Sequence, residues 1–72
     1  MKDNVILNYG EALKEQREKL GLSQSMLAKR ISTSHQNVSR WESGQVLPSI
    51  DFCVKLADLY DITLDELIGR DR

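Results

Sequence analysis

Cysteine, proline and long apolar runs are scarce in this 72-residue sequence. Its single cysteine, Cys53, excludes a disulfide within the chain, and one cysteine with one histidine cannot supply the four ligands of a structural zinc site. No stretch approaches the roughly 18 apolar residues of a membrane helix, and the apolar run at residues 5–7 is too short for a signal-peptide core. We therefore expect a cytoplasmic protein with no membrane partner, whose core depends on apolar packing alone.

An excess of basic residues, which is typical of proteins that bind nucleic acid, is also missing, since the formal net charge is −1. The charges are unevenly distributed, however. Residues 1–45 carry a net +2 and residues 46–72 carry a net −3. The segment from Lys19 to Trp41 holds four basic residues and no acidic one. A local positive face is therefore compatible with the acidic total, and the acidic residues of 46–72 are interpreted as a solvated face.

The spacing of the apolar residues predicts helices. There are only four glycines and one proline, and apolar residues recur at steps of three and four rather than in alternation. A chain of this length forms one domain and buries only about 60 to 65% of the surface that its unfolded form exposes. We predict an all-α fold of five helices over residues 9–69, preceded by an N-terminal arm, 1–8, and followed by a tail, 70–72.

The first two helices are predicted from their ends and from their inner faces. Asn8 and Glu11 have the spacing of a capping box, and Gly21 is suited to end the first helix. Ser23 is suited to cap a second helix that reaches about Ile31. The residues predicted to face inward are Tyr9, Leu13 and Leu20 on the first helix, and Leu27, Ala28 and Ile31 on the second.

A turn and a third helix follow the second. The hydroxyl side chains of residues 32–34 favour a turn and a helix cap, because they bond readily to nearby backbone amides. The third helix is expected to span His35 to Ser43 and to end at Gly44. Val38 and Trp41 lie three residues apart on one face, so they are expected to point into the core. Trp41 is accordingly interpreted as a core residue rather than a stacking platform.

Two further helices are expected after Pro48. Ser49 is suited to cap a fourth helix that extends to Tyr60, and Thr63 with Glu66 forms a capping box for a short fifth helix that ends at Gly69. Cys53 is interpreted as a small buried apolar residue. The residues predicted to be buried on the fourth helix are Ile50, Cys53, Leu56, Ala57 and Tyr60.

The segment SQSMLAKRISTSHQNVSRWESG, residues 23–44, resembles the helix-turn-helix of the phage repressor and Cro (Xre-like) family, with similarity from about Tyr9 to Gly69. Pro-Ser-Ile, Leu-Ala and Leu-Asp-Glu-Leu further along also match the family pattern. The resemblance implies a compact lambda-repressor-like DNA-binding domain that acts as a transcriptional regulator. The matching residues of the segment are Gln24, Ala28, Ile31, Val38, Trp41, Glu42, Ser43 and Gly44.

Two positions depart from the family pattern. Ser32 stands where the turn commonly has glycine, so a left-handed backbone there would cost roughly 1 kcal/mol. Asp61 stands where glycine often ends the fourth helix, although aspartate tolerates that conformation better than most residues.

The third helix is the predicted reading element. The second and third helices are expected to cross steeply over Ala28, so that the third helix stands out from the rest of the surface. A helix about 10 to 12 Å across fits the major groove, which is about 12 Å wide. Gln36, Asn37 and Arg40 have the side chains that bond adenine or guanine edges. The full set of predicted DNA-binding residues is Arg17, Ser23, Gln24, Lys29, Ser34, His35, Gln36, Asn37, Ser39, Arg40 and Ser43.

Several of these residues have roles that the resemblance implies. Gln24 is expected at a helix N-terminus against a phosphate, and Ser23 and Ser43 are expected to contact phosphates as well. Arg17 matches a family arginine that pairs with the glutamate found here as Glu42, a pair that is structural first. For His35 and Arg40, contact with either a base or a phosphate stays open, and Met26 is expected to be exposed.

We interpret the chain as a non-enzymatic regulator that binds a palindromic operator on double-stranded DNA as a homodimer, most simply as a repressor. No cofactor or small-molecule ligand is indicated. The dimer surface is expected on the fourth and fifth helices, with Ile62, Leu64 and Ile68, and the apolar residues 5–7 are a further candidate. A protein-interaction module, such as an antirepressor or an antitoxin-like partner, is the alternative function. An enzyme is disfavoured, because no catalytic constellation or glycine-rich phosphate loop is present.

Overall fold

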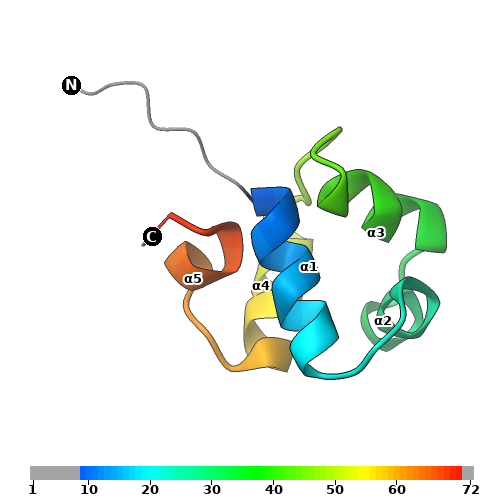
Figure 1. Ribbon diagram of the computed structural model, residues 1–72, viewed down its shortest axis with the longest axis horizontal. Helices are drawn as coiled ribbons and strands as arrows, with labels where there is room; N and C mark the ends of the chain where they lie inside the picture. Colours follow the sequence, from blue (N-terminus) through cyan, green and yellow to red (C-terminus); the bar gives the residue numbers. More distant parts are fainter. Residues whose placement is uncertain (1–8, 71–72) are drawn as a thin grey trace.

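The computed structural model describes residues 9–70 and shows the expected all-helical architecture within them (Figure 1). The predicted N-terminal arm, with the Asn8 half of the first capping box, and residues 71–72 lie outside this range. No helix in the described range is long and apolar enough to cross a membrane. The helices are α1 Tyr9–Lys19, α2 Gln24–Ile31, α3 His35–Glu42, α4 Ile50–Tyr60 and α5 Leu64–Ile68.

Helix α1 lies at the centre of the molecule, with α3 packed on one side of it and α5 on the other (Figure 1). Helix α2 packs against α3 and α4, and α4 also contacts α5. The side chains between these helices form one apolar core, which confirms the inward positions predicted for α2 and α3. The core consists of Leu13, Leu22, Leu27, Ala28, Ile31, Val38, Trp41, Cys53, Leu56, Ala57 and Leu67.

Hydroxyl side chains begin four of the helices, as their spacing predicts. Ser23, Ser34 and Ser49 have extended backbones, and each Oγ accepts a hydrogen bond from the amide three residues further on. Thr63 and Glu66 form both bonds of a capping box, with the Thr63 amide donating to the Glu66 carboxylate at 2.9 Å. These bonds satisfy helix N–H groups that lack a partner within the helix. They therefore fix where each helix starts.

Two helices end at residues other than glycine that have a left-handed backbone, and these are the two positions that depart from the family pattern. Ser32 has φ 62° and Asp61 has φ 57°, so both departures from glycine fall where glycine would be least strained. At the first of them, the amide of Thr33 donates to the carbonyl of Ala28 at 2.8 Å, which closes the end of α2. The turn between α2 and α3 therefore keeps its geometry without glycine.

We predicted Leu20 on the inner face of α1, and this prediction is wrong, because Leu20 is 50% exposed. The helix ends at Lys19, and the chain reverses at Gly21, which has φ 71°. The amide of Leu22 returns to the carbonyl of Arg17 at 3.2 Å, a Schellman ending that turns Leu20 outward. Leu22 enters the core in its place, and the next position along the inner stripe of α1 belongs to Arg17.

The predicted burial of Ile50 is also wrong, because its side chain is 71% exposed. It is the first residue of α4, so its side chain lies at the edge of the packed region, while Cys53 and the following inward positions carry the contact. Pro48 is buried in the preceding turn, and its carbonyl accepts a bond from the Cys53 thiol at 3.6 Å. Burial raises the pKa of the Cys53 thiol, which agrees with its interpretation as an apolar core residue.

Candidate nucleic-acid interface

Helix α3 is fixed in place by its two inward side chains. Val38 is completely buried and Trp41 is 5% exposed, and the Trp41 ring packs at a tilt against Phe52 of α4, with 5.2 Å between ring centroids. Trp41 is therefore a core residue, as predicted. Ala28 is buried where α2 meets α3, so the two short helices approach closely and the outer face of α3 stands at the surface.

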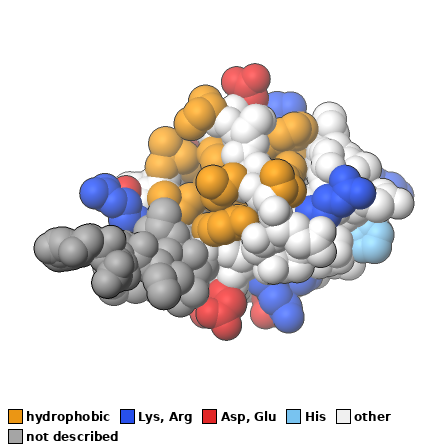
Figure 2. Space-filling view, turned by 90° about the horizontal axis from the view of Figure 1, so that it is seen from above, with side chains coloured by type: hydrophobic (Ala, Val, Ile, Leu, Met, Phe, Trp, Pro, Cys, Tyr) orange, Lys and Arg blue, Asp and Glu red, His pale blue; other side chains and the backbone are white. Residues whose placement is uncertain are grey.

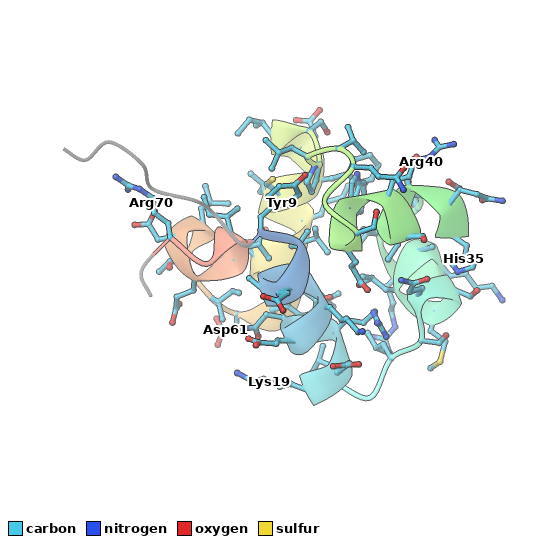
Figure 3. The ribbon with its side chains drawn as sticks, turned by 45° about the horizontal axis from the view of Figure 1, so that its top comes forward. Tyr9, Lys19, His35, Arg40, Asp61 and Arg70 are labelled. Carbon is cyan, nitrogen blue, oxygen red and sulfur yellow. The ribbon has the colours of Figure 1, made fainter. Side chains whose placement is uncertain are left out.

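The outer face of α3 carries polar side chains and one cation. His35, Gln36 and Arg40 are exposed, and Asn37 and Ser39 are half-buried. His35 and Arg40 lie on the side of the molecule formed by α2 and α3, away from Asp61 and Arg70 (Figure 3). Gln36 and Arg40 make no side-chain hydrogen bond within residues 9–70, so their full bonding capacity is available to a ligand.

Other predicted site residues have structural bonds in addition to any contact with DNA. The Asn37 amide donates to Thr33 Oγ1 at 2.9 Å and so braces the turn before α3. Ser43 Oγ donates to the carbonyl of Arg40 at 3.1 Å, and the hydroxyls of Ser23 and Ser34 accept the helix-capping bonds. Each of these hydroxyl and amide groups retains capacity for one more bond.

The predicted pair between Arg17 and Glu42 is present, and it is buried. Arg17 Nε donates to Glu42 Oε2 at 2.7 Å and Nη2 donates to Oε1 at 3.0 Å, while Nη1 donates to the carbonyl of Leu22 at 2.8 Å. The hydrogen bond to Glu42 raises the pKa of Arg17, against the lowering effect of burial. Arg17 is only 8% exposed, so these bonds give it the expected structural role, and a phosphate contact by Arg17 stays a prediction.

Gln24 connects this pair to the start of α3. Its Nε2 donates to Glu42 Oε1 at 3.0 Å, and its Oε1 lies 2.9 Å from His35 Nε2. Helices α1, α2 and α3 are thus joined by polar bonds beside the outer face of α3 as well as by the core beneath it. The amide of Gln24 is half-buried in this arrangement.

Lys14 is a candidate that the sequence reasoning missed. It lines a shallow hollow of about 210 Å³ together with Gln24, Ser39, Glu42 and Ser43, three of which are predicted site residues. Lys14 is exposed and lies one helical turn before Arg17 on α1, so the two side chains share a face. The three-residue spacing could have identified Lys14 in the sequence, because Arg17 was already expected to pair with Glu42 at the end of the third helix.

Lys29 is exposed near the end of α2, and its ammonium group makes no hydrogen bond or ion pair within residues 9–70. Figure 3 places Asp61, the residue that ends α4, on the opposite side of the molecule from His35. Arg40 of the basic stretch therefore lies on the His35 side of the molecule and Asp61 on the other, whereas Asp58 of α4 lines a surface hollow together with Arg30 of α2.

Tyr60 lies close to the Arg17–Glu42 pair, and its buried hydroxyl has no hydrogen-bond partner among the described residues. Burial, followed by the charge of Glu42, raises the pKa of Tyr60 to about 12. Because the folded state favours the neutral phenol, its stabilising contribution is complete below the unfolded pKa of about 10 and is lost as the pH rises toward 12.

We expect Tyr60→Phe to leave the free energy of unfolding unchanged or to raise it by about 1 kcal/mol near pH 8, because it removes an unsatisfied buried hydroxyl. Between about pH 10 and 12 the variant should lose less stability than the wild type. Urea unfolding at both pH values measures the difference, with Tyr9→Phe as the control. A loss above about 1 kcal/mol near pH 8 would show that the hydroxyl has a partner.

The crossing of α2 and α3, the short turn between them and the exposed polar face of α3 together define a helix-turn-helix domain. A family model described as Helix-turn-helix matches residues 13–67. The chain therefore belongs to the helix-turn-helix family of the Cro and phage-repressor type.

Two curated relatives illustrate the family. The transcriptional regulator ImmR of Bacillus subtilis is 34% identical over 65 residues, and the cryptic phage CTXphi transcriptional repressor RstR of Vibrio cholerae is 38% identical over 60 residues. These alignments cover 90% and 83% of this chain but 51% and 54% of the relatives, so the chain spans about half their length. Both are regulators rather than enzymes, and the expectation of a non-enzymatic domain is confirmed.

Solved structures confirm the repressor-like fold. The P22 c2 repressor, in a complex with a synthetic operator, superposes with a TM-score of 0.79 at 26% identity, over 89% of this chain and 96% of that one. The restriction-modification controller protein C.AhdI of Aeromonas hydrophila superposes with a TM-score of 0.75 at 36% identity, over 85% of this chain and 92% of that one. The predicted five-helix lambda-repressor-like architecture is therefore correct.

Proposed function

We propose that this domain binds double-stranded DNA in a sequence-specific way and regulates transcription, as a repressor that occupies an operator. The observation that carries the proposal is the outer face of α3, where exposed hydrogen-bonding side chains stand on a helix fixed by Val38 and Trp41. A helix held in this way fits the major groove. The P22 c2 repressor, which has the same fold and was solved in complex with a synthetic operator, supports operator binding by a domain of this kind.

The exposed side chains divide into two roles in this proposal. Gln36 and Arg40 read base edges, because a glutamine amide fits adenine and a guanidinium fits guanine. Lys29 and Lys14 neutralise phosphates, and the N-terminus of α2 at Gln24 presents backbone N–H groups to another phosphate. Of the other predicted site residues, Arg17, Ser23, Ser34, Asn37 and Ser43 keep the bonds that shape the face and set its register on the duplex. Ser39 is a further candidate for a phosphate contact, and His35 is considered below.

Alanine substitutions separate the two roles. We expect Gln36→Ala to weaken binding to the cognate site by about 1 to 3 kcal/mol and to relax the base preference at one position. Lys29→Ala should weaken binding to all duplexes about equally and reduce the salt dependence. Fluorescence anisotropy with a selected duplex and a scrambled duplex measures both effects. If Lys29→Ala alters the base preference and Gln36→Ala does not, the reading face lies elsewhere.

We propose that a second copy of the chain completes the operator-binding unit, because two domains can match half-sites about 34 to 36 Å apart. The sequence pointed to Ile62, Leu64 and Ile68, of which only Leu64 is exposed, at 44%. A larger apolar set follows α3, and Figure 2 shows hydrophobic side chains gathered on one face. This set comprises Val46, Leu47, Ile50 and Val54, each 46 to 71% exposed.

Sedimentation equilibrium of charged variants tests the dimer. We expect Ile50→Lys to shift the chain toward monomer and to lower the affinity for a two-half-site operator, without unfolding it, because Ile50 contributes little to the core. Leu64→Lys is the matched control. If Leu64→Lys is monomeric and Ile50→Lys stays dimeric, the dimer contact lies on α5 instead. A wild-type chain that binds the operator as a monomer would contradict the proposed dimer.

A further inference from the structure

Four polar side chains from three helices form a continuous hydrogen-bonded chain that ends on the reading face. It runs from Arg17 on α1 to Glu42 on α3, then to Gln24 on α2 and finally to His35 at the first turn of α3. Its inner end is buried, with the side chains of Arg17 and Glu42 exposed by 10% and 4%. Its outer end is exposed, and Figure 3 shows His35 at the edge of the α2–α3 side.

The chemistry of the inner pair fixes the direction of every bond in this chain. A guanidinium only donates hydrogen bonds, and a carboxylate only accepts them. Gln24 must therefore turn its amide nitrogen toward Glu42, at 3.0 Å, because the opposite orientation would set two acceptor oxygens against each other. Its carbonyl oxygen then faces His35 Nε2 at 2.9 Å, and this oxygen can only accept. His35 Nε2 must carry the proton.

The other ring nitrogen of His35 is consequently an acceptor whenever the imidazole is neutral. His35 Nδ1 makes no hydrogen bond within residues 9–70, and the residue is exposed beside Gln36 on the face assigned to DNA. A neutral His35 held in this way cannot donate to a phosphate or to guanine N7 and O6, since its one N–H is already in use. It can only accept.

We infer that Glu42, acting through Gln24, is a positioning residue that holds His35 as the Nε2–H tautomer, so that Nδ1 selects an exocyclic amino group in the major groove. Those groups are the N6 amino group of adenine and the N4 amino group of cytosine, the only base donors exposed there. The inference rests on the proposed function, because it assumes that α3 lies in the groove. It gives His35 a fixed donor, Nε2, and a fixed acceptor, Nδ1, whereas a freely rotating imidazole could exchange the two roles.

Nitrogen-15 NMR of the His35 ring tests the positioning part without DNA. The chain contains one histidine, so its ring signals are unambiguous. At about pH 8, where an ordinary imidazole is neutral, we expect Nε2 to be fully protonated and Nδ1 fully unprotonated. Gln24→Leu, which leaves the Arg17–Glu42 pair intact, should return the ring to exchange between tautomers, whereas Gln45→Leu should not. A mixed or Nδ1–H tautomer in the wild type overturns the inference.

Base analogues test the recognition part. A selected duplex is first scanned for the position whose preference His35→Ala abolishes. Replacing the adenine or cytosine there with an analogue that lacks the exocyclic amino group should weaken wild-type binding about five- to tenfold, and should not affect His35→Ala. Gln24→Leu should show a smaller loss than the wild type. Replacing the purine of the same base pair with its 7-deaza analogue should not change the wild-type affinity, and a loss of affinity there overturns the inference.

The two readouts separate this inference from the proposed function. If no duplex is bound, the proposed function fails, and the NMR measurement still decides whether Glu42 and Gln24 set the tautomer. If DNA is bound and removal of the amino group changes nothing at any position, the proposed function stands and the assignment of Nδ1 is wrong.

Discussion

Arg17→Ala is expected to lower the free energy of unfolding by about 3 to 5 kcal/mol, because it leaves the carboxylate of Glu42 buried without its cationic partner. A domain of this size has a total stability of only about 4 to 11 kcal/mol. The variant should therefore be substantially less folded near 37 °C (about body temperature), where stability is already lower than at its maximum. Urea unfolding monitored by circular dichroism measures the change.

Two further variants locate the cause of this loss in the buried pair. Arg40→Ala removes an exposed arginine from α3 and should change stability by no more than about 0.5 kcal/mol. The double variant Arg17→Leu with Glu42→Leu should recover most of the loss, since apolar residues can replace a buried ion pair at little cost. If Arg17→Ala costs less than about 1 kcal/mol, the pair does not hold α1 to α3.

Gly10→Ala is expected to destabilise the domain by about 2 to 3 kcal/mol, although alanine is the better helix former by about 1 kcal/mol. A Cβ at this position would overlap the backbone carbonyl oxygen of Glu42 and would lie 3.2 Å from that of Trp41. Both neighbours are backbone atoms at the end of α3, so the first turn of α1 has to move away from the reading helix. Thermal unfolding detects the loss.

Glu11→Ala is the control for the Gly10 variant, since it places alanine at the next, exposed position of the same helix. It should cost less than about 1 kcal/mol, mainly through the lost negative charge in the first turn. The DNA affinity of Gly10→Ala, measured under conditions where it is folded, should also fall because Glu42 is displaced. A stabilised Gly10→Ala variant would show that α1 and α3 are not in contact there.

The helix boundaries were largely predictable because local chemistry sets them. Ser23, Ser34, Ser49 and Thr63 each cap the helix that their spacing indicated, since a hydroxyl at that position satisfies an amide only a few residues away. The left-handed residues Ser32 and Asp61 were found through the family pattern. In both cases the determining contact lies within about five residues of sequence.

The predictions from sequence were wrong or incomplete where a side chain's position depends on residues far away in the sequence. Leu20 and Ile50 fit the apolar period of their helices, but each lies at a helix end, where the chain direction decides whether the side chain meets the core. The close approach of Gly10 to α3 involves residues more than thirty positions away, and periodicity carries no signal for it. The hollow beside Lys14 likewise forms only when α1, α2 and α3 pack together.

The third helix lies where the sequence predicted it, and the structure distinguishes the residues of its outer face more finely than the sequence could. Gln36 and Arg40 have unused bonding groups, whereas Asn37 braces the turn and Gln24 joins His35 to a buried ion pair. Hydrogen bonds between side chains depend on rotamers and on three helices at once. The sequence could therefore name the residues of the face but could not predict which of them are already bonded to one another.

Binding to a duplex selected from a random DNA pool tests the central claim, that α3 presents a DNA-reading face. The measurement is fluorescence anisotropy at two or more salt concentrations, with the wild type and with the double variant Gln36→Ala and Arg40→Ala. The account predicts that the logarithm of the wild-type binding constant falls linearly with the logarithm of salt concentration, by a slope of about −0.9 for each neutralised phosphate. It also predicts that the variant binds the selected duplex no better than a scrambled one. Wild-type binding that is absent at every salt concentration, or full discrimination by the variant, would contradict it.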